Sequence, residues 1–298
     1  MALPHFPSII FRKVARSGMA SKLGTAQRLL SNKSLTSMAG KGAVYLTAYL
    51  TIQSSYGDRM LYDRAVEDVR SRMEEEDGLE DVLDTVLEVE PGSPYSVDIS
   101  QLREEIRGLA ETVAAEEPET VLEIGTLRGG TFYVWSRYLD TAEQLVSLDL
   151  PGRDLKQRRD ELLHEFAPSK EVDVVRGNSH DEETFEETAE VLEDGADFLF
   201  IDGDHTYEGV KEDFEMYKEL AADDAVVAFH DIVPHARKKK ECKRRLREYD
   251  DLEERHVAVG NPDWGVSKFW DEIKDDYETK EIIAHPEQLG KGVGLLYL

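Results

Sequence analysis

The chain has 298 residues, with 36 Lys or Arg and 63 Asp or Glu, which gives a formal net charge of −27. A protein this acidic is repelled by nucleic acid as a whole, so nucleic acid is excluded as a partner. Such a surface is typical of proteins that work at high salt, and we expect a halophilic source. The single cysteine, Cys242, cannot form an intrachain disulfide, which favours a cytoplasmic location.

The positive charge is concentrated at the start of the chain. Residues 1–57 contain seven Lys or Arg and no Asp or Glu. We consider three roles for this basic arm: an ordered helical lid or homo-oligomer contact, peripheral contact with an anionic membrane at its cytoplasmic face, or disorder. No run of about eighteen apolar residues, the length of a spanning helix, is present.

Residues 58–95 form an acidic segment with a helical pattern. Leu61, Ala65, Val69 and Met73 recur every four residues, which predicts a helical linker or lid over Arg59 to Leu87. The sequence Pro-Gly-Ser-Pro at residues 91–94 then interrupts the pattern. We therefore place the main domain at residues 96–298.

Strand and helix patterns alternate through the main domain, which predicts an α/β fold with a parallel sheet and helices on both faces. The last two apolar runs lie close together in sequence and fit an antiparallel hairpin. The predicted strands are 120–124, 144–150, 171–176, 197–202, 225–231, 280–284 and 292–298. The predicted helices are 101–115, 131–138, 155–166, 182–192, 207–220 and 266–277.

The first strand runs into a glycine-spaced turn, VLEIGTLRGG, at residues 121–130. Glycine allows the backbone to turn tightly against a ligand, and the helix that follows offers unpaired N–H groups. We expect Glu123, Gly125, Thr126 and Gly129 to border a nucleoside cofactor. The dinucleotide fingerprint G-x-G-x-x-G is absent, which argues against a nicotinamide dehydrogenase.

The next two strands also end in polar residues. Asp149 closes the second strand, where a carboxylate can accept hydrogen bonds from both ribose hydroxyls; alternatively it caps a helix. After the third strand, Asn178, Ser179 and Asp181 are candidates to bind the adenine edge. Capping of the following helix is an equally good interpretation for Ser179 and Asp181.

The fourth and fifth strands end in acidic residues and histidines: IDGDH at 201–205 and FHD at 229–231. In open α/β sheets, ligands bind at the carboxyl ends of the strands. His205 is a candidate base for a substrate hydroxyl, with Asp202 as a second catalytic residue. Asp202, His230 and Asp231 are candidate ligands of Mg²⁺ or another divalent cation.

Four segments of the chain resemble class I S-adenosylmethionine-dependent methyltransferases in sequence and in order: VLEIGTLRGG, VSLDL, FIDGDHTYEGV and AFHDI. The resemblance covers residues 118–298 and points to the group with cephalosporin-hydroxylase-like and rhamnosyl or macrolide-sugar O-methyltransferases. It implies a Rossmann-like seven-stranded sheet with a C-terminal antiparallel hairpin, preceded here by an N-terminal helical extension. It also implies S-adenosyl-L-methionine at Glu123, Gly125 and Asp149, magnesium at Asp202 and Asp231, and a base at His205.

The chain departs from that pattern at His230, where metal-dependent relatives tend to carry an acidic residue. Imidazole suits softer ions, so this difference weakens the expectation of magnesium. The resemblance implies O-methylation of a sugar, glycan or small polyol. Two alternatives remain: a metal-independent methyltransferase acting on a carboxylate or other small molecule, and a non-catalytic scaffold with the same fold.

A basic cluster follows the fifth strand, with eight Lys or Arg among residues 237–247. It is a candidate to attract an anionic or lipid-linked substrate. A solvated helix face or an intersubunit contact is an equally good interpretation. Trp264, Phe269 and Trp270 are candidates for an aromatic wall, although packing of a helix face is the simpler use.

Overall fold

The computed structural model describes residues 55–88, 95–151, 158–192 and 194–298. The predicted basic arm at residues 1–57, with its membrane or oligomer contact, lies outside the described residues except for its last three positions. Within the described part, no helix is both long and apolar enough to cross a membrane.

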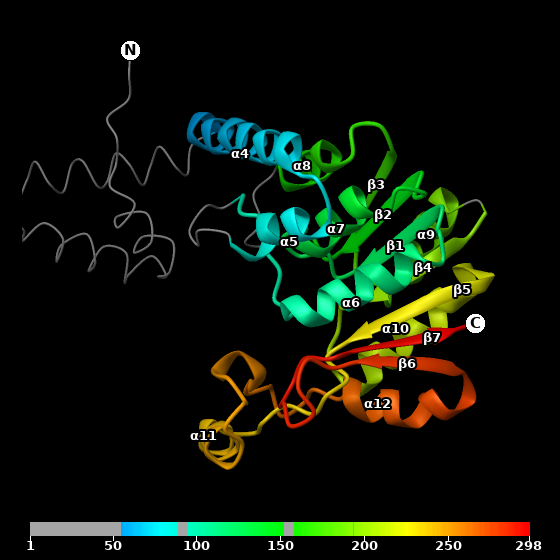
Figure 1. The fold of residues 1–298 in the computed structure, drawn as a ribbon. Coiled ribbons are helices and arrows are strands. Elements are labelled where there is room, and N and C mark those ends of the chain that lie inside the picture. The colour runs from blue at the N-terminus through cyan, green and yellow to red at the C-terminus, as the bar shows by residue number, and fades with distance from the viewer. Residues whose placement is uncertain (1–54, 89–94, 152–157, 193) are drawn as a thin grey trace, which may run out of the picture.

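The centre of the fold is a seven-stranded sheet in the order β3-β2-β1-β4-β5-β7-β6 (Figure 1). Strands β1 to β5 are parallel, and β7 is antiparallel to both β5 and β6. This arrangement confirms the predicted Rossmann-like methyltransferase sheet with its closing hairpin. The strands are β1 Thr120–Ile124, β2 Gln144–Asp149, β3 Glu171–Arg176, β4 Ala196–Ile201, β5 Ala221–His230, β6 Glu278–Ile282 and β7 Val293–Tyr297.

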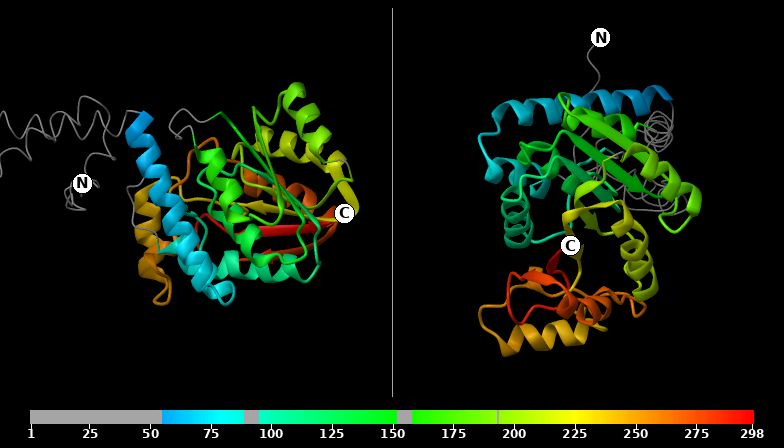
Figure 2. Two further views of the ribbon diagram at one scale, coloured as in Figure 1. Left: turned by 90° about the horizontal axis from the view of Figure 1, so that it is seen from above. Right: turned by 90° about the vertical axis from the view of Figure 1, so that its right-hand side faces the viewer.

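Helices cover both faces of the sheet (Figure 2), because successive strand residues point to opposite sides. Val121, Phe198 and Phe200 belong to one hydrophobic core, and Leu122 and Leu199 to the other. The first core contains residues of α4 Ser55–Glu75, α5 Leu79–Leu87, α6 Arg103–Ala114, α7 Gly130–Tyr138 and α8 Arg159–Phe166. The second contains residues of α10 Tyr207–Tyr217 and α12 Val266–Ile273, with α9 Glu182–Val191 at its margin.

The acidic segment before the main domain forms two helices, α4 and α5, rather than one. The first ends at Glu75 and the second begins at Leu79, after Gly78. Their apolar residues, Val69 and Leu83 among them, share one continuous core with the sheet. The segment therefore packs as part of the main domain.

The basic cluster forms a further helix, α11 Lys239–Glu248, whose side chains are mostly solvated. Figure 1 shows this helix beyond the end of the sheet toward which β5 points. It lies on the same side of the molecule as the carboxyl ends of the parallel strands, where the polar residues predicted from the sequence are found.

Replacing Leu83, which is fully buried in α5, tests whether the two extension helices belong to the main core. We expect Leu83→Ala to destabilise the whole domain by about 2–5 kcal/mol, because the cavity opens in a shared core. Urea unfolding followed by circular dichroism should show a single transition at lower denaturant. Glu67→Ala, at an exposed position of α4, is the control; a separate early transition for α4 and α5 would contradict the prediction.

Candidate active site

The glycine turn after β1 lies against the neighbouring loop that follows β4. Gly125 has φ 95°, and a Cβ there would lie 2.3 Å from the carbonyl oxygen of Asp202. Gly129 has φ 78° and caps the N-terminus of α7. Both positions require the left-handed conformation that glycine adopts most easily. The turn therefore brings backbone close to the open edge of the sheet.

Glu123 lies beneath this turn and does not face the open edge. It is fully buried, and its carboxylate accepts hydrogen bonds from the Thr131 hydroxyl at 2.7 Å and the Trp135 indole N–H at 2.6 Å. Burial, which outweighs these two bonds, raises its pKa to about 8. The carboxylate fastens α7 to β1 and so supports the turn from below, while the cofactor contact expected of Glu123 stays a prediction.

Thr126 and Asp149, the other candidate polar residues near the ends of β1 and β2, differ in burial. Thr126 is buried, and its hydroxyl accepts a hydrogen bond from Ser147, so this side chain also stabilises the turn from within. Asp149, in contrast, is partly exposed at the end of β2. Its two carboxylate oxygens accept from the backbone N–H groups of Leu127 and Leu150, and burial raises its pKa. Asp149 thus stands directly beside the glycine turn.

The loop after β3 continues the same edge. Asn178 donates to the Asp181 carboxylate at 3.1 Å, and the Ser179 carbonyl accepts from Tyr217. Asp181 occupies the N-cap position of α9, but its side chain makes no capping hydrogen bond there. The structure therefore brings Asn178, Ser179 and Asp181 to the strand edge, next to Asp149.

Four side chains from the ends of β4 and β5 form one compact cluster. His230 Nδ1 lies 3.1 Å from Asp202 Oδ1, and His205 Nδ1 lies 3.2 Å from Asp231 Oδ2. A third distance, 3.8 Å between His205 Nε2 and Asp202 Oδ1, closes the group. The tips of β4 and β5 converge because the two strands are adjacent and parallel.

The carboxylates and imidazoles of this cluster shift one another's pKa values. Burial opposes protonation of His230, yet the two carboxylates outweigh it and raise its pKa to about 9. Burial likewise opposes a charge on His205, but the hydrogen bond to Asp231 and the charge of Asp202 raise its pKa. The imidazoles in turn hold the pKa of Asp231 well below its usual range, against the effect of burial.

Backbone strain marks the same place. Asp231 has φ 68°, a conformation that residues other than glycine rarely adopt and that the surrounding structure must hold in place. The Lys291 N–H donates to Asp231 Oδ1 at 3.1 Å, which fixes the carboxylate from the β6–β7 loop.

Two residues of the site were not indicated by the sequence. Gln101, ahead of α6, donates from its amide to Asp202 Oδ2 at 2.9 Å, and Lys291 reaches Asp231 as described. The Lys291 ammonium also donates to the Ser100 carbonyl, which joins these two loops. No local motif marks either residue, since each reaches its partner across more than fifty positions of sequence.

The donor set does not fit a divalent cation. Asp202 Oδ2 accepts from Gln101, Asp202 Oδ1 faces His230, and Asp231 binds His205 and Lys291. His230 Nδ1 lies 3.1 Å from Asp202 Oδ1, so this nitrogen and this oxygen are directed at each other. Among the described residues, no group of three or more His, Cys, Asp or Glu side chains has the arrangement of a metal site.

A cavity of about 350 Å³ opens beside the cluster. Its walls are the loop after β5 and the loop before α12, and its lining includes His205, Asp231, Arg237, Trp264 and Lys268. The Trp264 ring lies over the His205 imidazole, with ring centroids 4.8 Å apart. Phe269 and Trp270, the other candidates for an aromatic wall, are buried in the second core.

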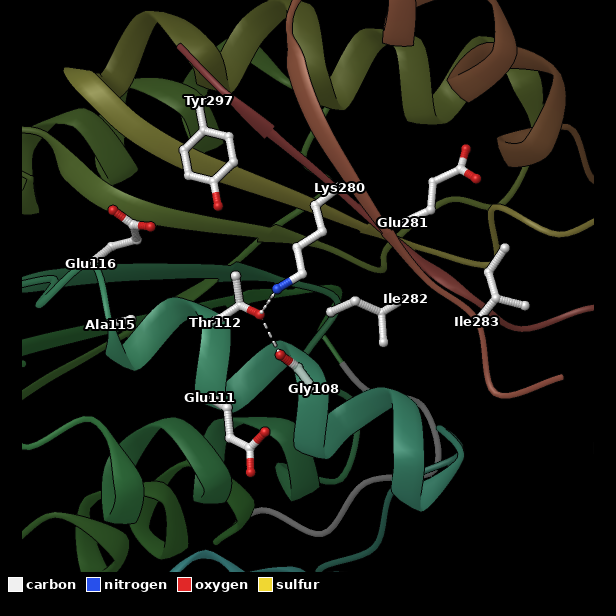
Figure 3. Close-up of a pocket in the computed structure, with 10 residues that line it drawn as sticks. All are labelled: Gly108, Glu111, Thr112, Ala115, Glu116, Lys280, Glu281, Ile282, Ile283 and Tyr297. Carbon is white, nitrogen blue, oxygen red and sulfur yellow. Dashed lines mark hydrogen bonds between the residues drawn. The ribbon is translucent and has the colours of Figure 1, made fainter. Parts of the chain in front are cut away.

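A larger hollow, of about 610 Å³, lies elsewhere. Figure 3 shows it between α6 and the edge strand β6, where Lys280 donates to the Thr112 hydroxyl. None of the residues at the strand tips lines it. We therefore take the smaller cavity beside His205 as the candidate acceptor pocket.

The buried Glu123 provides a test of the site's construction. The pKa of Glu123 in the folded chain is above the usual 4.5, so ionisation of this group destabilises the fold. Its contribution to the free energy of unfolding therefore falls as the pH rises from about 4.5 to about 8. Glu123→Gln removes the charge; its amide oxygen can accept from the Trp135 indole, and its NH2 group can donate to the Thr131 hydroxyl. We expect the stability of this variant relative to the native chain to improve between pH 5 and pH 8, measured by urea unfolding. An equal difference at both pH values would contradict the prediction.

Comparisons with known proteins agree with this architecture. Residues 122–232 match the profile of a family described as a methyltransferase domain. An uncharacterized protein of Acanthamoeba polyphaga mimivirus is 28% identical over 129 residues, which are 42% of this chain and 57% of that protein. The match thus spans little more than half of that relative.

Two solved structures are also similar. An O-methyltransferase of Bacillus cereus in complex with S-adenosylhomocysteine has 14% identity and a TM-score of 0.42, over 79% of this chain and 90% of that one. The O-methyltransferase TomG of Streptomyces achromogenes, in complex with S-adenosylmethionine, has 17% identity and a TM-score of 0.44, over 75% and 90%. The segment that matches the family runs from β1 to Asp231 and carries the glycine turn and both acidic strand tips. Residues 122–232 are therefore similar to a methyltransferase domain, and they lie in a sheet with the strand order of the Rossmann-like methyltransferase fold.

Proposed function

We propose that this protein transfers a methyl group from S-adenosylmethionine to a hydroxyl oxygen of a sugar or another small polyol, without the help of a metal. The observation that carries the proposal is the pair of His205 and Asp231, which stands between the glycine turn and the cavity. A base held by a carboxylate at the border of a cofactor edge and a pocket is what proton removal from an acceptor requires.

The cofactor is expected along the ends of β1, β2 and β3. Asp149 would accept hydrogen bonds from the ribose hydroxyls, as predicted from its place after β2. Leu127 and Leu150 flank it and are 63% and 58% exposed. Large apolar side chains this open are suited to lie against a purine, and they support a nucleoside at this position.

When bound, S-adenosylmethionine supplies a methyl group that its sulfonium already activates. The protein must then align the acceptor oxygen and remove its proton. Because a carboxylate can only accept hydrogen bonds, the 3.2 Å contact with Asp231 places a proton on His205 Nδ1. The other ring nitrogen, Nε2, is left to take the acceptor proton, and the Trp264 ring limits the tilt of the imidazole.

The remaining residues of the cluster hold this arrangement. Asp202 lies 3.8 Å from His205 Nε2 and stabilises the imidazolium that forms when the proton arrives. Gln101 and His230 fix the Asp202 carboxylate from two sides, and Lys291 fixes Asp231. Because the two carboxylates of the cluster are paired with imidazoles, we assign the cluster no metal and expect turnover without one.

Replacing the base tests the proposal. We expect His205→Ala to reduce methyl transfer by about 10²-fold or more, since proton removal is lost, while affinity for S-adenosylhomocysteine stays unchanged. The assay follows methyl-labelled S-adenosylmethionine with a panel of sugars and polyols, and mass spectrometry identifies a product with one added methyl group. His164→Ala, which changes an exposed histidine on α8, is the control.

The same assay separates the alternatives. A chelator such as EDTA should leave the rate unchanged; a loss that Mg²⁺ restores would establish the metal-assisted form instead. Methyl transfer to carboxylate oxygens alone would favour a carboxyl methyltransferase. Undiminished transfer by His205→Ala would refute the assignment of the base, and cofactor binding without any transfer would favour a scaffold.

Cofactor placement has its own test. Asp149→Ala should weaken binding of S-adenosylhomocysteine by about 10- to 100-fold, because hydrogen bonds to a charged acceptor contribute about 1.5–3 kcal/mol. Isothermal titration calorimetry measures the affinity directly. Asp173→Ala, on the adjacent strand β3, serves as the matched control, and an equal loss there would contradict the assignment of Asp149.

A further inference from the structure

The cavity beside His205 has a built aromatic wall. Trp264 is 38% exposed, and its ring contacts both the His205 ring and the His235 ring, at 4.8 Å and 4.7 Å between centroids. The Gly265 N–H donates to the His205 carbonyl at 2.8 Å, and Thr206 forms an isolated bridge with Trp264. These contacts fix the indole relative to the base, so the wall is part of the site.

Two cations line the same cavity, and neither forms an ion pair with a carboxylate of the described residues. Glu272, on the same helix as Lys268, is within range of the charge of Lys268. For Arg237, the structure shows no hydrogen bond or ion pair of the guanidinium with any described residue, whereas Arg176 and Arg255 both pair with acids. Lys268 places its ammonium 3.8 Å from the centroid of the Tyr207 ring, where the aromatic face holds the charge without neutralising it.

The acidic residues of the cavity lining form no ion pair with Arg237 or Lys268. Asp231 is buried and directed at His205 and Lys291, and Asp263 is exposed on the rim. Lys239 and Lys240, at the start of α11, extend the positive charge outward from Arg237. The pocket therefore presents positive charge from two segments of its lining, the loop after β5 and α12.

Building on the proposed function, we infer that the acceptor is a hydroxylated ring that carries an anionic group, a carboxylate or a phosphate. Its ring would lie on Trp264, its anion between Arg237 and Lys268, and one hydroxyl at His205 Nε2. A cavity of about 350 Å³ suits a compound of monosaccharide size. A neutral sugar would use the aromatic wall and leave both cations in water.

The test compares D-glucuronate, D-glucose 1-phosphate and D-glucose by calorimetry at matched ionic strength, with and without S-adenosylhomocysteine. We expect at least one of the two anionic sugars to bind at least tenfold more tightly than glucose. The double variant Arg237→Gln/Lys268→Gln should lose that preference. Arg247→Gln, which removes one charge from α11 outside the cavity, should retain it.

Three outcomes would overturn the inference: glucose binding as tightly as both anionic sugars, no binding by any of the three, or an equal loss in Arg247→Gln. The last would mean that the basic helix attracts anions at long range and that the cavity does not select them. Arg237 and Lys268 are exposed, so the variants should fold, and unchanged affinity for S-adenosylhomocysteine checks this. Failure of that cofactor to bind the native chain would refute the proposed function separately.

Discussion

The site depends on the parallel register of β1, β4 and β5. Ile124 pairs with Ile201, and Ile201 pairs with Phe229, so all three strands end at the same level. The residues that follow, Gly125 and Asp202 among them, are thereby placed side by side, which is why a Cβ at Gly125 would meet the Asp202 backbone. A slip of one residue in either pairing would turn the strand's side chains to the opposite face and disperse the cluster.

Buried ionisable groups lie at two places near these strand ends, and the protein stabilises each of them in a different way. Glu123 has no cationic partner in the part of the chain that the structure describes, and its raised pKa reflects that burial favours the neutral acid. At the strand tips, acids and imidazoles compensate one another, with His230 between Asp202 and Asp231. Breaking such a network on one side leaves an uncompensated charge, so the cluster is held as a unit. This cohesion fixes His205 in the orientation that proton transfer needs.

The sequence was sufficient for the fold and for the residues at the strand ends. Alternating apolar patterns marked the strands, and Asp149, Asp202 and Asp231 stood where each pattern stopped. It was insufficient for Gln101 and Lys291, because their roles arise from loops that meet only in three dimensions. The role of Glu123 was harder to predict, because it depends on which face of α7 meets the carboxylate. Thr131 and Trp135 are four residues apart on α7, so both side chains reach Glu123.

A crystal structure with S-adenosylhomocysteine would test the central claim most directly. With the adenosine held at Asp149, we expect the homocysteine sulfur to face His205 and to open onto the cavity lined by Trp264, Arg237 and Lys268. A cofactor bound away from the glycine turn, or with its sulfur directed away from His205, would contradict the role proposed for His205.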